Sequence, residues 1–351
     1  MHEPHQDGRP VVSSKRIPHP GFPAFSRAQK LKHDRERRLR SAQPPFHHAF
    51  HHLFAAVAAA TIAVSVNAEV LYGMSYGGSL YALNTTNGTA TVVRGPLAPA
   101  YQTCDSLEYA DGWFYASYGG GKVVRFGFEC GDEVDLGPSG RPWVEAIAMR
   151  ADGTLFAAVS QNNDVGAESI GILDPVTGDL SNVVASSNQS VLWDMDALAF
   201  SPTGTLYAIN LSIPRVLATI DPVTGGIGST VALTGAYAGM AWSASGTLYA
   251  LDIQVGSCAG TTILTAINPV TGAETPIGPT GLTCVAGLTF GPNLPAVNAD
   301  LNHDNSVNAA DLAILLGAWG PCGPSCCLAD LNLDGQVNAA DQALLLGAWT
   351  V

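Results

Sequence analysis

The feature that most constrains the fold is a repeat between residues 69 and 292. A short turn recurs five times, and its last glycine falls at positions 88, 131, 178, 225 and 272, so successive copies lie 43, 47, 47 and 47 residues apart. Three copies read Asp-Pro-Val-Thr-Gly or Asn-Pro-Val-Thr-Gly, in which proline presets φ and glycine takes a left-handed conformation. A period of this length indicates one supersecondary unit per repeat, and each unit needs its neighbours to bury its apolar face.

Each repeat holds four candidate strands. The first type has apolar residues at alternate positions, which indicates a half-buried strand. The second reads Leu-Tyr-Ala or a close variant and starts at residues 71, 114, 155, 206 and 248. The third runs into the turn, and the fourth follows the turn glycine. Four strands per unit of about 45 residues, arrayed radially, predict a mainly β fold containing a five-bladed β-propeller.

The two ends of the repeat region predict how the ring closes. The first repeat begins at its second strand, and a strand with the first-strand pattern is left over at residues 286–290. We expect this C-terminal strand to complete the first blade and close the propeller. The alternatives are an open β-array or a sandwich. The repeats resemble those of repeat β-propellers in their general pattern, without a diagnostic motif.

A second, shorter repeat lies near the C-terminus, where an Asp/Asn-rich segment occupies residues 300–311 and again residues 330–341. Calcium takes about six to eight oxygen ligands, and a loop of about twelve residues supplies them from positions 1, 3, 5, 7, 9 and 12. The predicted ligands of two Ca²⁺ ions, with position 7 acting through its backbone carbonyl, are Asp300, Asn302, Asp304, Ser306, Asn308 and Asp311, and Asp330, Asn332, Asp334, Gln336, Asn338 and Asp341.

Two further features bear on the calcium prediction. Position 12 is Asp rather than the usual Glu, and position 6, where the loop turns sharply, is Asn305 in the first copy and Gly335 in the second. From residue 300 onward there is no Lys, Arg or Glu, and every Asp is a predicted ligand. The alternative is a pair of polar turns that bind nothing.

An apolar helix face is predicted after each loop. Its residues are Leu312, Leu315, Leu316 and Trp319 in the first copy and Leu345, Leu346 and Trp349 in the second. Two such loop-helix halves resemble a type I dockerin over residues 300–349. The resemblance implies a small α-helical, calcium-folded domain that binds a cohesin-like or other surface protein. The chain departs from the dockerin pattern at loop positions 10 and 11, which are Ala rather than Ser/Thr, and in having no basic residue on the helices. A standard cohesin as partner depends on those positions, whereas the calcium prediction does not.

The first 68 residues are interpreted as a leader. Residues 1–52 are polar and basic, and residues 53–66 form an apolar run of signal-peptide length followed by small residues up to Ala68. The run is short for a transmembrane span, so we expect a secreted or extracellular protein, with attachment to a cell surface as an option. Without the leader, 25 acidic and six basic residues give a net charge of −19. This acidity disfavours nucleic acid and anionic membranes as partners.

Carboxylates are predicted at the mouth of the propeller channel. They lie two positions before the central apolar residue of the first strand in three successive blades, at Asp105, Glu145 and Asp196, with Ala238 and Ala286 in the other two. Residues expected on the same rim are the aromatic Tyr101, Trp143, Trp193 and Tyr237, together with Asp194. Clustered carboxylates can act as acid/base pairs, so Asp105, Glu145 and Asp196 are candidate catalytic residues. The alternative is that they cap strand ends. Since His303 is the only histidine after residue 52, His-based catalysis and His metal sites are excluded from the propeller.

Seven cysteines in a secreted chain predict disulfides. Cys258 and Cys284 are the preferred pair, Cys104 and Cys130 are expected on opposite faces, and one local bridge is expected among Cys322, Cys326 and Cys327.

The predicted organisation is a leader at 1–68, a β-propeller at 69–292, a linker at 293–299 and a dockerin-like calcium-binding domain at 300–351. The favoured interpretation is a propeller that recognises a carbohydrate or protein ligand, joined to an anchoring module. One alternative is a glycoside hydrolase or polysaccharide lyase, and another is a non-catalytic structural surface protein.

Overall fold

The computed structural model describes residues 69–101, 103–160, 168–254, 260–294, 297–323 and 327–350. The predicted leader, with its signal sequence, lies outside the described residues, and so do Cys258 and Cys326. No helix within the described ranges has the length and apolar character needed to cross a membrane.

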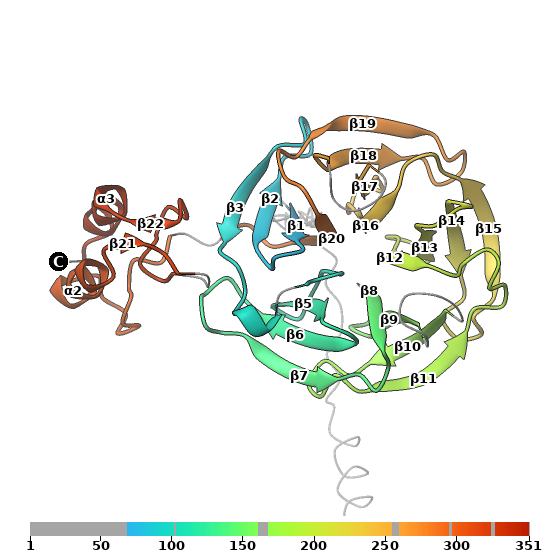
Figure 1. Ribbon diagram of the computed structural model, residues 1–351, viewed down its shortest axis with the longest axis horizontal. Coiled ribbons are helices and arrows are strands. Elements are labelled where there is room, and N and C mark those ends of the chain that lie inside the picture. Colours follow the sequence, from blue (N-terminus) through green and yellow to red (C-terminus); the bar gives the residue numbers. More distant parts are fainter. Residues whose placement is uncertain are drawn as a thin grey trace, which may run out of the picture. The chain divides into compact units, whose positions relative to one another are not determined.

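Five four-stranded antiparallel sheets surround a central axis like the blades of a propeller (Figure 1). From the innermost strand outward, blade 1 contains β20 (Val285–Gly291), β1 (Val70–Ser75), β2 (Leu80–Leu83) and β3 (Ala90–Arg94). Blade 2 contains β4 (Glu108–Ala110), β5 (Trp113–Tyr118), β6 (Lys122–Phe126) and β7 (Val134–Pro138), and follows a short 3₁₀ helix, η1 (Pro99–Tyr101). Blade 3 contains β8 (Trp143–Met149), β9 (Leu155–Ser160), β10 (Ser169–Leu173) and β11 (Leu180–Ala185). Blade 4 contains β12 (Met195–Phe200), β13 (Leu206–Asn210), β14 (Val216–Ile220) and β15 (Ile227–Ala232). Blade 5 contains β16 (Tyr237–Trp242), β17 (Leu248–Asp252), β18 (Ile263–Ile267) and β19 (Glu274–Pro279). The predicted mainly β, five-bladed propeller is confirmed.

The innermost strand of blade 1 comes from the far end of the repeat region. β20 runs antiparallel to β1, with Leu71 opposite Phe290 and Gly73 opposite Leu288. Inner strands of neighbouring blades approach closely: a Cβ added at Gly239 in β16 would lie 2.1 Å from the carbonyl oxygen of Ala286 in β20. Glycine is therefore required where these two backbones meet.

The hydrophobic core lies between the blades. Five clusters of buried side chains each join two neighbouring blades, and small alanines on the inner strands alternate with Leu, Ile and Phe from the second and third strands. One example is Ala146 and Ala148 of β8, which pack with Leu198 of β12. Because each blade buries its face only against a neighbour, the stability of the ring is shared by all five blades.

The repeated turns have the predicted chemistry. The side chains of Asp174, Asp221 and Asn268 each accept hydrogen bonds from the backbone N–H groups two and three residues later, at 2.8–3.3 Å. These bonds hold the pKa values of Asp174 and Asp221 below their usual range. The glycines that close the turns have positive φ, for example +74° at Gly178 and +70° at Gly225.

The C-terminal segment forms two short helices, α2 (Ala309–Gly317) and α3 (Ala339–Gly347), and a two-residue ribbon of β21 (Gly320–Pro321) with β22 (Gln336–Val337). Its buried residues form one cluster within the segment, Ala299, Leu301, Val307, Leu315, Ala329, Leu331, Val337 and Leu345. The predicted helices are confirmed, but the predicted core is wrong in part. Each helix buries one leucine, because loop residues such as Val307 and Val337 fill the space beneath it.

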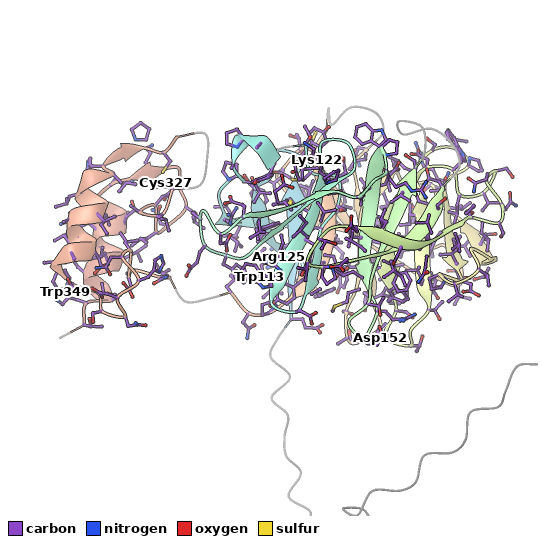
Figure 2. The ribbon with its side chains drawn as sticks, turned by 90° about the horizontal axis from the view of Figure 1, so that it is seen from below. Trp113, Lys122, Arg125, Asp152, Cys327 and Trp349 are labelled. Atoms are coloured by element: carbon purple, nitrogen blue, oxygen red, sulfur yellow. The ribbon has the colours of Figure 1, made fainter. Side chains whose placement is uncertain are left out.

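Besides the buried leucines, Leu312 of the predicted helix face is half-buried against this cluster, and the other residues of the face are exposed. Leu316, Trp319, Leu346 and Trp349 are 50%, 49%, 48% and 38% exposed. Trp349, which is labelled in Figure 2, follows the last residue of α3, Gly347.

Three of the described cysteines are free thiols: Cys104, Cys322 and Cys327. Because Cys322 and Cys327 are both free, the predicted local bridge among Cys322, Cys326 and Cys327 is wrong. Cys130 and Cys284 are each disulfide-bonded. Because Cys258 lies outside the described residues, the Cys258–Cys284 pairing stays a prediction.

Candidate functional site

β-Bulges position the residues predicted at the channel mouth. In β8 the register passes from Val144 opposite Val159 to Ala146 opposite Ala158, so Glu145 is the extra residue of a bulge. Asp196 is the extra residue of the equivalent bulge in β12, between Met195 and Ala197. Bulges re-aim side chains and are common beside functional sites. Blades 1 and 5 have the same irregularity but carry Ala286, and Ala238 with Gly239, there.

Three carboxylates meet at this point. One oxygen each from Glu145, Asp194 and Asp196 lies within 4.8 Å of the other two. Glu145 and Asp194 are only 5% and 7% exposed, and Asp196 is half-buried. The inner strands β8 and β12 are neighbours, so the cluster joins blades 3 and 4.

The composition of this cluster corrects the predicted trio. Asp105 is not one of the three clustered residues, and Asp194 takes the third place. In blade 2 the inner strand begins only at Glu108, and the chain before it makes a single isolated bridge, from Cys104 to Tyr118. Asp105 therefore precedes the strand rather than lying on a bulge within it. Asp194 was expected on the rim but was not counted with the three acids; its place beside Asp196 follows because residues two apart on an extended chain share a face.

Asn210 at the end of β13 fixes the backbone that carries Asp194. This fully buried side chain accepts hydrogen bonds from the N–H groups of Trp193 (2.9 Å) and Asp194 (3.0 Å). Its Nδ2 donates to the carbonyl oxygens of Ser212 (2.7 Å) and Pro214 (3.0 Å). Asp194 is thereby held by its backbone, while its carboxylate accepts no hydrogen bond within the described part of the chain.

The spacing of the carboxylates limits their chemistry. Glycosidase pairs stand about 5–5.5 Å or 6.5–9.5 Å apart, which leaves room for a sugar or a water between them. The cluster is tighter than either arrangement. It is suited to gathering positive charge rather than to holding a glycosidic bond between an acid and a base.

The predicted aromatic rim is partly corrected. Tyr237 is 1% exposed and belongs to the core between blades 4 and 5, so it cannot contact a ligand. Burial, with Glu274 nearby, raises the pKa of its hydroxyl. Trp143 and Trp193 are half-buried, and the indole Nε1 of Trp143 is buried without an acceptor among the described residues.

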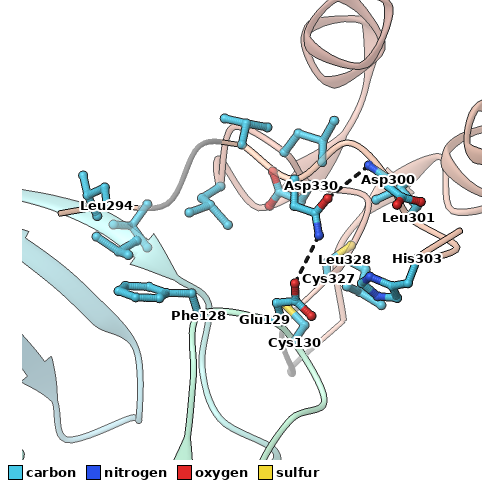
Figure 3. A pocket seen from close by; sticks show the side chains of 16 residues that line it. Phe128, Glu129, Cys130, Leu294, Asp300, Leu301, His303, Cys327, Leu328 and Asp330 are labelled. Carbon is cyan, nitrogen blue, oxygen red and sulfur yellow. Dashed lines mark hydrogen bonds between the residues drawn. The ribbon is translucent and has the colours of Figure 1, made fainter. Parts of the chain in front are cut away.

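The two Asp/Asn-rich loops fold alike. The first carboxylate of each accepts backbone hydrogen bonds from positions 5 and 6: Asp300 from Asp304 (3.1 Å) and Asn305 (2.7 Å), and Asp330 from Asp334 (3.1 Å) and Gly335 (2.8 Å). Position 6 is left-handed in both, with φ of +70° at Asn305 and +87° at Gly335. Figure 3 labels Asp300 and Asp330.

The last carboxylate of each loop is fully buried and links the loop to its helix. Asp311 accepts from the N–H groups of Leu301 (2.8 Å), Asn302 (3.1 Å) and Asn308 (2.8 Å). Burial opposes its ionisation, but these donors prevail and hold its pKa below the usual range. Asp341 accepts from Asn332 (3.1 Å) and Asn338 (2.8 Å) in the same way. Each loop is therefore tied to its helix through the side chain of its last Asp residue.

The middle positions of the loops also match. The amide of Asn302 donates to Asp304 (2.9 Å) and that of Asn332 to Asp334 (3.0 Å). Asn308 and Asn338 cap the two helices through bonds to Ala310 and Ala340. The oxygen-only donor set of the twelve predicted ligands fits a hard cation such as Ca²⁺. A difference between the loops is Cys322, whose thiol lies 3.6 Å from Asp330.

No family model and no curated protein match this chain. Similar solved structures include one titled as the de novo evolutionary emergence of a symmetrical protein (15% identity, 65% of this chain and 100% of that chain, TM-score 0.43). A chain of a nidogen/laminin complex is 15% identical (63% and 98%, TM-score 0.42), and a putative gluconolactonase is 15% identical (62% and 76%, TM-score 0.42). These likenesses carry no argument about activity or ligand.

Proposed function

We propose that the chain is an exported, non-catalytic recognition protein whose C-terminal segment, residues 300–349, is a calcium-dependent attachment module similar to a type I dockerin. The observation that carries this proposal is the matched geometry of the two loops. Carboxylates at positions 1 and 12 accept backbone hydrogen bonds from corresponding positions in both copies, at residues 300 and 311 and at 330 and 341, with one additional bond from Leu301 to Asp311. Two polar turns with no shared ligand have no physical reason to keep this correspondence.

The module offers a surface for a protein partner. The exposed side of α2 consists of alanines with Ile314, Leu316 and, just beyond the helix, Trp319; α3 repeats this with Leu344, Leu346 and Trp349. Surface helices normally present charged or polar residues there, and exposed apolar patches mark interaction sites. A cohesin-like or other surface protein with an apolar, uncharged contact face is the partner that this surface suits.

The propeller is assigned the recognition role. With the leader removed, the chain is strongly acidic, and its channel mouth carries three carboxylates beside half-buried tryptophans. A neutral, hydroxyl-rich carbohydrate or a protein is the class of ligand that suits this surface. The carboxylate spacing does not favour the glycosidase alternative.

Calcium should control folding of the module. Its core is self-contained within residues 299–345, and without a cation each loop holds three like charges that oppose folding. Cation binding then becomes folding free energy. A peptide of residues 295–351 should be largely unfolded in chelator and helical with Ca²⁺ in far-ultraviolet circular dichroism. Mg²⁺ should substitute poorly, because it demands tighter octahedral geometry.

Substitutions in one or both of the two loops provide the controls. Asp300→Ala or Asp330→Ala alone should weaken the calcium response, and the double change should abolish it. A wild-type spectrum indifferent to Ca²⁺ contradicts the calcium assignment. A calcium response with no binding to any cell-surface extract leaves the calcium site standing and contradicts attachment.

A further inference from the structure

We propose that Glu145, Asp194 and Asp196 form a third cation site, in the propeller itself, that binds Ca²⁺ at the channel mouth. This inference does not depend on the C-terminal module. It rests on the position, burial and spacing of three carboxylates contributed by blades 3 and 4.

Electrostatic repulsion among the three carboxylates disfavours the cluster without a cation. One oxygen from each carboxylate lies within 4.8 Å of the other two, so three negative charges repel one another in a partly desolvated place. Asp194 is more than nine-tenths buried, yet its carboxylate accepts no hydrogen bond and joins no ion pair in the part of the chain that the structure describes. Burying an uncompensated carboxylate is strongly unfavourable. A cation among the three groups removes both penalties.

The spacing and the donor atoms of the cluster are compatible with Ca²⁺. Ca²⁺–O distances of about 2.3–2.6 Å allow two ligands of one ion to lie up to about 5 Å apart, whereas Mg²⁺, at about 2.0–2.1 Å, needs them within about 4.2 Å. Separations within 4.8 Å are compatible with Ca²⁺ without movement of the strands. No His or Cys belongs to the cluster, so the donor set selects a hard cation rather than zinc.

The backbone that carries the three carboxylates is held rigidly. Glu145 projects from a bulge where β8 pairs with β9, and Asp196 projects from a bulge where β12 pairs with β13. Asn210 holds the backbone of Asp194. A site on packed strands keeps its ligands in place before the ion arrives, which favours affinity. Three carboxylates also leave Ca²⁺ with coordination positions for water or for oxygen atoms of a ligand. The ion would therefore favour a propeller ligand rich in hydroxyl or carboxylate groups.

The test counts calcium ions on the full chain by equilibrium dialysis. Four proteins are compared: wild type, a loop variant (Asp300→Ala with Asp330→Ala), a channel variant (Asp194→Asn with Asp196→Asn) and a control, Asp179→Asn. Asp179 is an exposed carboxylate of blade 3. The channel variant should bind one ion fewer than wild type, and the control should bind the same number. The loop variant should keep the channel ion, so the two kinds of site are scored separately.

A thermal melt separates cation binding from a merely structural role. In chelator the channel variant should melt higher than wild type, because like charges have been removed. At about a hundredfold excess of Ca²⁺ over Kd, the channel ion should raise the Tm of the propeller by roughly 5–10 °C, and this rise should be absent in the channel variant. A structural role alone would lower the Tm of the variant in both conditions.

Two outcomes overturn the proposal. One is an equal ion count in wild type and channel variant. The other is a loop variant that binds no calcium and melts identically with Ca²⁺ and chelator, which decides the matter even if the channel variant does not fold.

Discussion

The two carboxylate-rich regions of this chain are built in opposite ways. In the C-terminal loops every predicted ligand lies within twelve residues, and the first and last carboxylates accept hydrogen bonds from backbone N–H groups of the same loop. At the channel mouth, Glu145 comes from one blade while Asp194 and Asp196 come from the next. Here the carboxylate of Asp194 accepts no hydrogen bond within the described residues. The loops depend on local sequence, and the channel cluster depends on the fold of the ring.

The two sites should therefore be disrupted by different changes. A loop site should survive damage to the propeller, because its core and its hydrogen bonds lie within its own segment. The channel cluster should fail with any change that separates blades 3 and 4, however distant in sequence. Three changes test this contrast, and they are described in order of decreasing effect.

Deleting β20, residues 285–291, should have the largest effect. The deletion leaves β1 as an open inner edge and takes Val285 and Leu288 from the cluster between blades 5 and 1. We expect loss of the cooperative thermal transition of the propeller, while the calcium-induced helical signal of the module remains. A matched truncation after residue 299, which removes the module instead, should leave the propeller transition in place. A monomeric β20 deletion that melts like wild type would show that this strand does not close the ring.

Replacing Arg94 should have an intermediate effect on the propeller. This fully buried side chain of β3 donates to Glu133 (2.8 Å) and Asp132 (3.3 Å) of blade 2 and lies over Phe126. Burial opposes ionisation of Glu133, but Arg94 prevails and lowers the pKa of that carboxyl. Arg94→Met leaves two acids without their counter-charge, and losing one partner of a buried pair costs about 3–5 kcal/mol. The measurement is the free energy of unfolding in urea.

Arg150→Met is the matched control. Arg150 pairs with Asp152 at 2.7 Å, but their side chains are 35% and 55% exposed, against 0% for Arg94, and Figure 2 labels Asp152 on the propeller. Exposed pairs contribute little, so the free energy of unfolding should hardly change. Equal losses in the two variants would mean that burial of Arg94 does not govern its contribution. A changed calcium response of the module in either variant would break the proposed independence of the two regions.

The contrast between local and distant construction also explains what could be predicted from the sequence. The blades were predictable because each carries its own strand alternation and its own Asp/Asn-Pro-Val-Thr-Gly turn. The loops were predictable because their Asp and Asn residues have a fixed spacing. Asp105 was placed in the channel cluster by counting from an apolar residue, but blade 2 starts its inner strand late, at Glu108. Counting along one chain does not report where a neighbouring strand begins.

Burial was the other property that the sequence did not determine. Trp319 and Trp349 have helix-face spacing, yet both lie largely exposed because loop residues fill the small core. Tyr237 was predicted on the rim of the channel mouth, yet its side chain packs between blades 4 and 5. In both cases the periodicity indicated a face correctly, while the neighbouring element decided whether that face met solvent.

The smallest effect is expected at Glu108, on the inner strand of blade 2. The equivalent positions in the other blades, each opposite an aromatic residue of the second strand, are Ala148, Ala199, Ala241 and Thr289. Glu108 is thus a lone carboxyl among small side chains, and it accepts hydrogen bonds from the Tyr109 N–H (3.0 Å) and the Thr289 hydroxyl (3.1 Å). Burial outweighs these bonds and raises its pKa to about 8.

A raised carboxyl pKa makes the folded state favour the protonated form. The stabilisation is fully present below the unfolded pKa of about 4.3 and is lost as pH rises toward 8. Glu108→Gln keeps the acceptor and stays neutral, so its Tm should exceed that of wild type at pH 8.5 and match it near pH 4. The measurement is Tm against pH.

Glu274 provides a control of opposite sign. Burial opposes its ionisation, but hydrogen bonds from Thr234, Tyr237 and Gly235 outweigh it and lower its pKa. Its contribution is therefore present above the unfolded pKa and is lost as pH falls through the lower, folded value. Glu274→Gln should reduce Tm at neutral pH and converge on wild type in acid, the reverse of Glu108→Gln. If both variants shifted Tm in the same direction at every pH, the effects would be ones of packing rather than of charge. The raised pKa of Glu108, which results from its burial between blades, would then not explain the effect of its substitution.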